Sequence, residues 1–185
     1  YICVYYICRI FKIKLDMITG KYPSLRLRRG RKNSWSRRLV SENNLSPNDF
    51  ILPIFLIEGK NKTQPIKSMP GVSRYSINRL GEILDRAIKN RIPMVALFPY
   101  TSSNLKDHLG SEALNEDNLV CRAIRYIKKR YKNQIGIMCD VALDPYTIHG
   151  HDGILKSNSI MNDETIEILI QQSLLQAQMG CDVLA

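Results

Sequence analysis

A chain of 185 residues is long enough to bury the hydrophobic core of one domain of moderate size. Its formal net charge of +10 permits an acidic partner but does not decide the fold. Five cysteines, an odd number without CxxC spacing, argue against a disulfide framework and a clustered cysteine zinc site. We therefore expect a protein of the reducing cytoplasm, with Cys139 and Cys181 as small buried apolar side chains.

The first apolar segment, residues 1–11, is far shorter than the roughly 20 residues that cross a bilayer. It also lacks the basic start and the small-residue cleavage site of a secretory signal. A peripheral membrane helix is an alternative for this segment.

A basic segment follows, with eight Lys or Arg residues and no acid between Lys21 and Arg38. Most of the excess positive charge therefore belongs to one arm. A solvated, partly disordered arm is one interpretation, and nucleic-acid binding is another, although no recognised fold motif or aromatic platform accompanies the charges. Within this arm we predict a short helix over residues 34–40.

Strands and helices then alternate to the end of the chain. We predict strands over residues 50–57, 94–98 and 135–139 and a fourth that opens at 181–185, and helices over residues 76–91, 115–132 and 162–180. Pro53 in the first strand demands an irregularity or an unpaired neighbour there, because proline has no N–H to donate. Strict alternation predicts a parallel sheet, and four strands with three helices correspond to half of an eight-stranded α/β barrel.

Two of these helices have a predicted start and a predicted buried face. Ser76 is the expected cap of the first helix, and Asn162 is the expected cap of the last. The residues expected to point inward share a spacing of three or four. They are Ile77, Leu80, Leu84, Ala87 and Ile88 in the first helix and Ile166, Leu169, Ile170, Leu174 and Ala177 in the last.

The stretch from Cys139 to Gly153, here called the signature loop, carries most of the polar chemistry. The third strand ends at its start, and the ionisable or metal-capable residues Asp140, Asp144, His149, His151 and Asp152 follow. Loops at the carboxyl ends of parallel strands carry the chemistry of α/β folds, so we expect an active site here, with Asp140 inside the pocket.

The metal preference of this loop is open on the residues alone. The carboxylates Asp144 and Asp152 suit Mg²⁺ or water-mediated contacts, whereas His149 and His151 suit Zn²⁺. Two imidazoles spaced two apart in an extended loop can point to opposite sides, so they need not share a metal. A hydrogen bond within the loop is the alternative role of each histidine.

The signature loop from Asp140 to Gly153 closely resembles the metal-site signature of the porphobilinogen synthase (delta-aminolevulinic acid dehydratase) family. Four further stretches resemble the same family in the same order, and the match runs from about Arg26 to Ala185. They are residues 45–55, 65–76, 97–99 and 106–113. The resemblance implies a TIM (β/α)8 barrel, of which this α/β chain would be the first half, preceded by an extended basic N-terminal arm.

Domain boundaries follow from this resemblance. Because family-like sequence starts only after Met17, we expect Met17 to be the initiator and residues 1–16 to be a non-native extension. Residues 17–48 would form the arm, and residues 49–185 a partial barrel cut off in its fourth strand. In the family such an arm embraces a neighbouring subunit, which implies a homo-oligomer, an octamer in the usual case.

The resemblance also implies a metal class. In zinc-dependent members three cysteines stand at the positions of Ala142, Asp144 and Asp152, and Ala142 cannot ligate a metal. A zinc thiolate site is therefore not expected, and Asp144 and Asp152 point to the aspartate-rich subclass that uses Mg²⁺ or a monovalent cation. Ile148 departs from the usual serine, which puts one loop hydrogen bond in question.

The implied reaction condenses two molecules of 5-aminolevulinate to porphobilinogen with loss of two waters, a step of tetrapyrrole and heme biosynthesis. In the family two lysines form Schiff bases with the substrates. The resemblance places both lysines beyond Ala185, and neither Lys106 nor Lys156 inherits the role. We therefore expect no catalytic lysine in this chain, active-site contributions from Asp140, Asp144 and Asp152, and an aggregation-prone fragment that is inactive alone.

Two other classes of function remain open at this point. One is a noncatalytic metal-binding or assembly module, and the other is a nucleic-acid-binding protein that acts through the basic arm. On the family interpretation we expect 5-aminolevulinate as the small-molecule partner, a cytoplasmic location, and neither nucleic acid nor a membrane as a partner.

Overall fold

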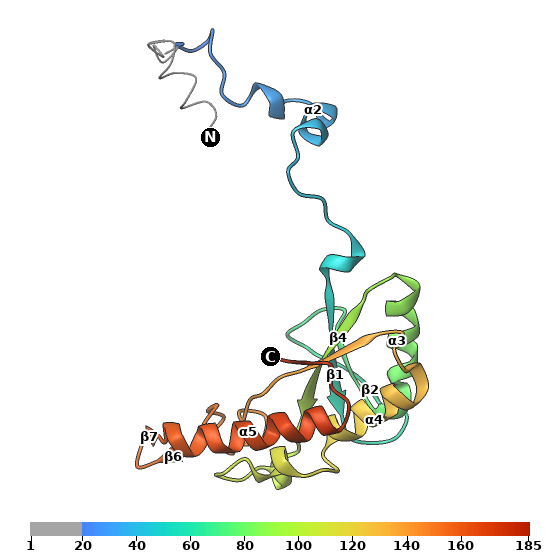
Figure 1. Ribbon diagram of the computed structural model, residues 1–185, viewed down its shortest axis with the longest axis vertical. Coiled ribbons are helices and arrows are strands. Elements are labelled where there is room, and N and C mark those ends of the chain that lie inside the picture. The colour runs from blue at the N-terminus through green and yellow to red at the C-terminus, as the bar shows by residue number, and fades with distance from the viewer. Residues whose placement is uncertain (1–19) are drawn as a thin grey trace, which may run out of the picture. The chain divides into compact units, whose positions relative to one another are not determined.

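The computed structural model describes residues 20–185, and the chain divides into two units between Asn44 and Leu45 (Figure 1). The predicted extension, residues 1–16, lies outside the described residues. No helix in the described part of the chain is long and apolar enough to span a membrane.

The first unit contains a 3₁₀ turn, Arg29–Arg31, and one short helix, α2, Ser34–Leu39. The predicted helix at residues 34–40 is thus confirmed, with Val40 as its last, capping residue. Ser36 closes the first turn, because its hydroxyl donates to the carbonyl of Asn33 and accepts from the Asn33 N–H. Arg37 ties α2 to the preceding turn through hydrogen bonds to the carbonyls of Arg31 and Lys32.

The second unit is built on one six-stranded sheet in the order β2-β3-β1-β4-β5-β8 (Figure 1). The predicted strands appear as β1 (Ile51–Ile57), β4 (Met94–Tyr100), β5 (Gly136–Cys139) and β8 (Val183–Leu184). Neighbours in this set pair in parallel, so the prediction of a parallel sheet is confirmed. Their spatial order follows their order in the chain, as it does in the first half of a (β/α)8 barrel.

Three helices connect these strands, and they begin or end within a few residues of the predicted bounds. They are α3 (Leu80–Lys89), α4 (Leu119–Tyr131) and α5 (Asn162–Gln178). Single 3₁₀ turns lie at Pro47–Asp49, Ile77–Arg79, Ser103–Leu105 and Ser111–Leu114. Neither predicted cap is confirmed. Ser76 precedes the 3₁₀ turn Ile77–Arg79 without a side-chain cap bond, and α3 begins only at Leu80. α5 already includes Asn162, and Met161 precedes it without a side-chain cap.

Two small hairpins were not predicted. β2 (Thr63–Pro65) pairs antiparallel with β3 (Ser73–Tyr75), and β6 (Leu155–Lys156) pairs with β7 (Ser159–Ile160). β3 also pairs in parallel with β1, but only opposite Phe55 and Leu56. Pro53 therefore pairs with β4 on one side and with no described strand on the other. The open side tolerates a proline, which has no N–H to donate, as the sequence required.

A large core fills the space between the sheet and helices α3 and α4. Leu84, Ile124 and Ile137 are fully buried in it, and Leu80 and Ala87 confirm the predicted inner face of the first helix. Cys139 belongs to the same core, as predicted, whereas Cys181 is only partly buried and packs at its border.

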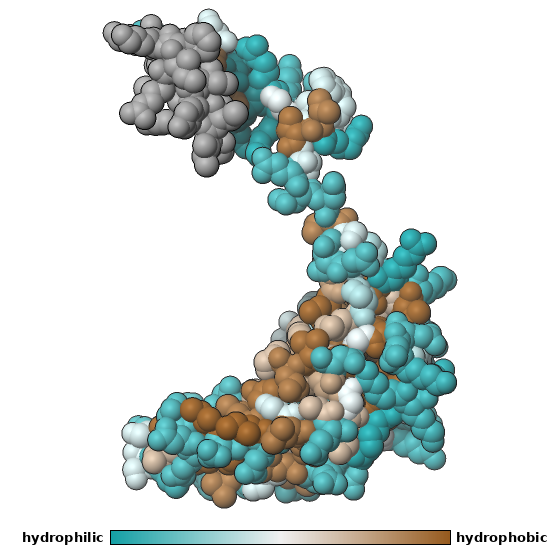
Figure 2. Space-filling model, in the orientation of Figure 1, coloured by the Kyte–Doolittle hydropathy of each residue, from teal (hydrophilic) through white to brown (hydrophobic). Residues whose placement is uncertain are grey.

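The inner face of α5 was predicted wrongly for most of its residues, although Leu169 is partly buried and packs against Leu143 and Tyr146 as predicted. Ile166, Ile170 and Leu174 are exposed, and Figure 2 shows a row of hydrophobic residues along the outer side of this helix. Thr165, Leu175 and two glutamines, Gln172 and Gln176, are buried instead. The sequence is ambiguous here because apolar residues occupy two sides of the helix, and the side that packs inward is selected by hydrogen-bonding partners in the neighbouring loop.

Asp182 links α4 to the sheet and makes stability depend on pH. Its carboxylate accepts hydrogen bonds from Lys128 Nζ at 2.7 Å and from the Ile137 N–H at 2.8 Å. Partial burial opposes ionisation, but these hydrogen bonds outweigh it and lower the pKa of Asp182 below its ordinary value of 3.8. The stabilisation is thus complete above the ordinary pKa and is lost as pH falls through the lower, folded-state pKa.

We expect Asp182→Asn to flatten the fall in unfolding free energy between about pH 5 and about pH 3, because the amide carries no charge to lose. Urea unfolding at several pH values measures this slope. Asp163→Asn, an exposed aspartate at the start of α5, is the control. Equal slopes in the wild type and Asp182→Asn would contradict the assignment.

Candidate active site

An open pocket of about 270 Å³ lies where the carboxyl ends of β1, β4 and β5 meet. Strands β1 and β4 contribute its aromatic floor, β3 contributes Arg74, and the loops that leave β4 and β5 contribute its other charged groups. The lining residues are Phe55, Arg74, Phe98, Pro99, Tyr100, Lys106, Asp140, Asp144 and Pro145. Catalytic groups of parallel α/β folds gather at this end of the strands.

Strand register brings four of these side chains into one row. Arg74 pairs with Phe55, and Phe55 pairs with Phe98. Because Cys139 pairs with Leu97, the next residue, Asp140, comes level with Phe98. The two phenyl rings lie 5.7 Å apart between their centroids, so an aromatic floor separates a guanidinium from a carboxylate.

The cationic side of the pocket was missed by sequence reasoning. The Arg74 guanidinium lies over the Tyr100 ring, 4.6 Å from its centroid, which is a cation–π contact. Lys106 lines the same pocket from the loop after β4. No sequence signal identified Arg74, because the strand β3 that carries it lies in a stretch predicted to be a loop.

Two backbone hydrogen bonds tie the loop after β4 to the signature loop. The Asp107 N–H donates to the carbonyl of Tyr146, and the Ile148 N–H donates to the carbonyl of Asp107. The Asp107 carboxylate in turn accepts from the N–H groups of Leu109 and Ser111. These bonds place Lys106 on the side of the pocket that holds Asp144.

The acidic side consists of Asp140 and Asp144, the two residues predicted there that line the pocket. Partial burial raises the pKa of Asp140, and the nearby charge of Asp152 raises it further. Burial also raises the pKa of Asp144, Asp152 and Asp140 add to the effect, and Lys106 partly offsets it. Burial and the neighbouring charges disfavour the ionised form of both carboxyl groups. Both side chains are nevertheless exposed on one side to solvent, which still allows them to ionise.

Asp152 does not line the pocket. One of its carboxylate oxygens accepts a hydrogen bond from the Leu143 N–H and so fixes the backbone of the signature loop at that residue. Its charge still acts on both Asp140 and Asp144, which shows that the three carboxylates share one neighbourhood.

The three histidines of the chain lie in one group on the loops. The ring of His149 lies 6.2 Å from that of His108 and 5.5 Å from that of His151, between centroids. His149 Nδ1 accepts from the His151 N–H, and its Nε2 lies 3.4 Å from the carbonyl of His108. His149 therefore has the loop hydrogen-bonding role that was the alternative to zinc binding.

Among residues 20–185 no group of three or more His, Cys, Asp or Glu side chains is placed to enclose a metal ion. The donors that do gather near the pocket are carboxylate oxygens, and Cys139 is buried in the core with a pKa raised by its contact with Cys181 and by burial. Hard oxygen donors, few in number, fit Mg²⁺ that keeps several of its waters, and they do not fit a thiolate zinc site.

Lys106 gives one direct test of these electrostatics. The charge of Lys106 partly offsets the rise in the pKa of Asp144. Lys106→Met is therefore expected to raise that pKa further. Carboxyl ¹³C NMR titration of the chain measures the midpoint. Lys156→Met removes a lysine that pairs with Glu164 instead and serves as the control. An unchanged Asp144 midpoint in Lys106→Met would show that the two side chains do not interact.

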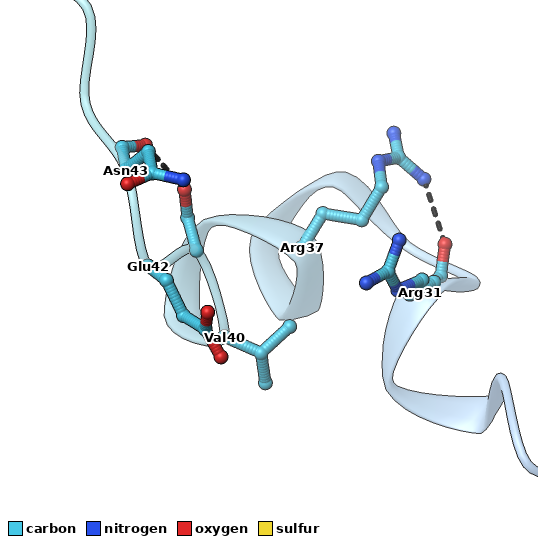
Figure 3. Close-up of a pocket in the computed structure, with 6 residues that line it drawn as sticks. Arg31, Arg37, Val40, Glu42 and Asn43 are labelled. Carbon is cyan, nitrogen blue, oxygen red and sulfur yellow. Dashed lines mark hydrogen bonds between the residues drawn. The ribbon is translucent and has the colours of Figure 1, made fainter.

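Another hollow, of about 320 Å³, lies in the first unit, and Figure 3 shows the residues around it. Arg31, Arg37 and Glu42 are its charged members. Arg37 already donates to backbone carbonyls, the Ser41 hydroxyl donates to the carbonyl of Asn43, and no second carboxylate lines this hollow beside Glu42. The chemistry of the described chain is therefore concentrated at the strand ends.

Comparison with known proteins gives one consistent result. The family model "Delta-aminolevulinic acid dehydratase" matches residues 24–185. A delta-aminolevulinic acid dehydratase of Bradyrhizobium diazoefficiens is 52% identical over 162 residues, which cover 88% of this chain and 46% of that protein. One from Chlamydia pneumoniae is 40% identical, with 88% of this chain and 48% of that protein covered.

A solved structure agrees in fold. The crystal structure of delta-aminolevulinic acid dehydratase (porphobilinogen synthase) from Toxoplasma gondii, in complex with the reaction product porphobilinogen, matches with a TM-score of 0.80 and 38% identity. The match covers 86% of this chain and 46% of that one. The chain thus spans about half the length of the relatives it matches.

Proposed function

Because the chain belongs to the delta-aminolevulinic acid dehydratase family, we propose that it forms the first half of a porphobilinogen synthase active site. The complete site condenses two molecules of 5-aminolevulinate to porphobilinogen with loss of two waters. The observation that carries the proposal is the pocket at the strand ends, where Asp140 lies across an aromatic floor from Arg74, and Asp144 lies beside Lys106.

This arrangement suits an amino acid substrate. 5-Aminolevulinate carries an ammonium group at one end and a carboxylate at the other. Asp140 and Asp144 offer acceptors to the ammonium group, and Arg74 offers a planar pair of donors to the carboxylate. The apolar rings of Phe55 and Phe98 would cover the carbon chain of the substrate between its two charged ends and keep water away from it.

Carbonyl activation needs an amine that this half does not supply in our proposal. The two Schiff-base lysines come from sequence that follows Ala185 in the family pattern. Lys106 lines the pocket beside Asp144, and our proposal gives it no Schiff-base role.

A cation would complete the acidic side of the site. We propose Mg²⁺, or a monovalent cation in its place, held by Asp144 and Asp152 with waters in its remaining positions. The support is electrostatic, because burial raises the pKa of Asp140 and Asp144, and repulsion among Asp140, Asp144 and Asp152 raises it further. Bound Mg²⁺ would neutralise this charge and polarise a substrate oxygen.

Our proposal extends to the assembly and the location of the protein. We propose a homo-oligomer, octameric as in the family pattern, with the basic arm of residues 17–48 on a neighbouring subunit. In the first unit Trp35, Leu39 and Val40 are exposed, which supports an interface role for this segment. We propose a cytoplasmic location, in keeping with the free thiols of Cys121, Cys139 and Cys181.

The decisive experiment compares this chain with a chimera in which the carboxyl-terminal half of the Bradyrhizobium diazoefficiens relative follows Ala185. Both are purified and assayed for porphobilinogen formation from 5-aminolevulinate, with and without Mg²⁺. We expect the chimera to be active, more so with Mg²⁺, and the 185-residue chain to be inactive. Activity of the shorter chain would instead make Lys106 a Schiff-base candidate, and a folded but inactive chimera would overturn the proposal.

A further inference from the structure

Helix α5 presents two buried glutamines to the signature loop, one helical turn apart. Gln172 Nε2 donates to the carbonyl of Ala142 at 3.1 Å, and Gln176 Nε2 donates to the carbonyl of Asp140 at 3.1 Å. The two side chains are 1% and 3% exposed, so the contacts are shielded from water. Buried hydrogen bonds of this kind are stronger and better defined than those on a surface.

The two buried glutamines cost stability in a helix that packs on a core. The Oε1 atom of each is buried and has no hydrogen-bond donor within reach among residues 20–185. A buried polar atom without a partner lowers stability, whereas a leucine or methionine at either position would place no such atom on the helix. Packing alone therefore does not explain two amides at this face.

Their targets show what they do. The parallel ladder between β4 and β5 ends at Cys139, so the residues that follow have no partner on that strand. Each of the next four residues nevertheless has one backbone group fixed. Gln176 holds the Asp140 carbonyl, Ala185 accepts from the Val141 N–H, Gln172 holds the Ala142 carbonyl, and Asp152 accepts from the Leu143 N–H.

We propose that Gln172 and Gln176 are positioning residues of the active site. They fix the backbone from Asp140 to Ala142, which follows the last residue of β5 that pairs with β4. The Asp140 carboxylate therefore stays in the pocket. This inference rests on the proposed function for its catalytic consequence, but its structural part concerns the loop alone. Neither glutamine lines the pocket, so each acts through the backbone of the residue it holds.

The kinetic test uses Gln172→Met and Gln176→Met in the chimera, because methionine keeps the length and volume of glutamine and removes the amide. We expect kcat to fall about 10- to 100-fold in each, since small displacements of a reacting group cost that much. KM should change less than kcat, because Arg74 and Asp144, two of the three proposed substrate-binding groups, are not held by these glutamines.

Two controls on the same helix separate positioning from stability. Gln171→Met changes an exposed glutamine and should leave kcat unchanged. Leu175→Ala removes a buried apolar side chain between the two positions and should lower the melting temperature while kcat, measured well below that temperature, stays near wild type. If the methionine variants behave as Leu175→Ala does, the glutamines are only part of the packing.

A second readout does not depend on activity. Hydrogen exchange of the 185-residue chain, followed by mass spectrometry, should show the segment from Asp140 to Leu143 exchanging about tenfold faster in Gln176→Met than in the wild type. Exchange in β4 should be unchanged. Unaltered exchange at the signature loop would overturn the positioning role whatever the activity. Faster exchange in the variant, beside an inactive wild-type chimera, would support the role and overturn the proposed function.

Discussion

Replacing Asp140 with asparagine is expected to lower the kcat of the chimera for porphobilinogen formation by about 100-fold or more. Asparagine keeps the shape of the side chain but cannot carry the negative charge that faces a substrate ammonium group, and it cannot accept a proton. Steady-state kinetics with 5-aminolevulinate measures the effect, and circular dichroism and melting show whether the variant is folded.

The fold should tolerate this change, because the Asp140 side chain is exposed at the pocket surface and is not a member of the large core. Asp163→Asn, at the exposed start of α5, provides the matched control and should retain full activity. A folded Asp140→Asn chimera with kcat within about threefold of the wild type would remove Asp140 from the reaction.

The largest loss of stability from a single change near the site is expected for Leu143→Ala. Leu143 is fully buried in a small second core with Ala113 and Tyr146, against which Ile168 and Leu169 of α5 pack. Truncation to alanine should lower the unfolding free energy by about 2–5 kcal/mol, because the transfer of the side chain from water is lost and a cavity remains. Denaturant unfolding of the chain measures this difference.

Ile148→Ala is the control for this prediction, since it removes a similar side chain from the same loop at a position that is 59% exposed. We expect its effect to stay within about 0.5 kcal/mol. Comparable losses in the two variants would mean that the signature loop is not anchored by its own core.

The elements that sequence predicted well are those in which one strong pattern dominates. The apolar runs that became β1, β4 and β5 have no competing interpretation, because each is short, apolar and bounded by polar loops. The position of Asp140 and Asp144 in the pocket follows from the same pattern, since both come directly after a buried strand.

What sequence could not predict depends on contacts between distant segments. Arg74 reaches the pocket only because β3 pairs with β1 at Phe55, and three residues of Ser-Arg-Tyr carry too little pattern to identify a strand. The face that α5 buries was predicted wrongly for a related reason. Hydrophobicity favoured Ile166, Ile170 and Leu174, but the buried carbonyls of Asp140 and Ala142 need donors, and only the glutamine face supplies them.

The make-up of the large core has a consequence for the time at which the site is built during synthesis. Every fully buried member of that core lies between Ile54 and Cys139. A ribosome that has released these residues has therefore released every buried member of this core, while most of the signature loop, α5, and the border residues Met179 and Cys181 are still to come. Domains of growing chains fold in this vectorial way, N-terminal parts first. The signature loop then packs onto a core that has already formed. An error in the docking of α5 would misplace Asp140 and leave the sheet intact.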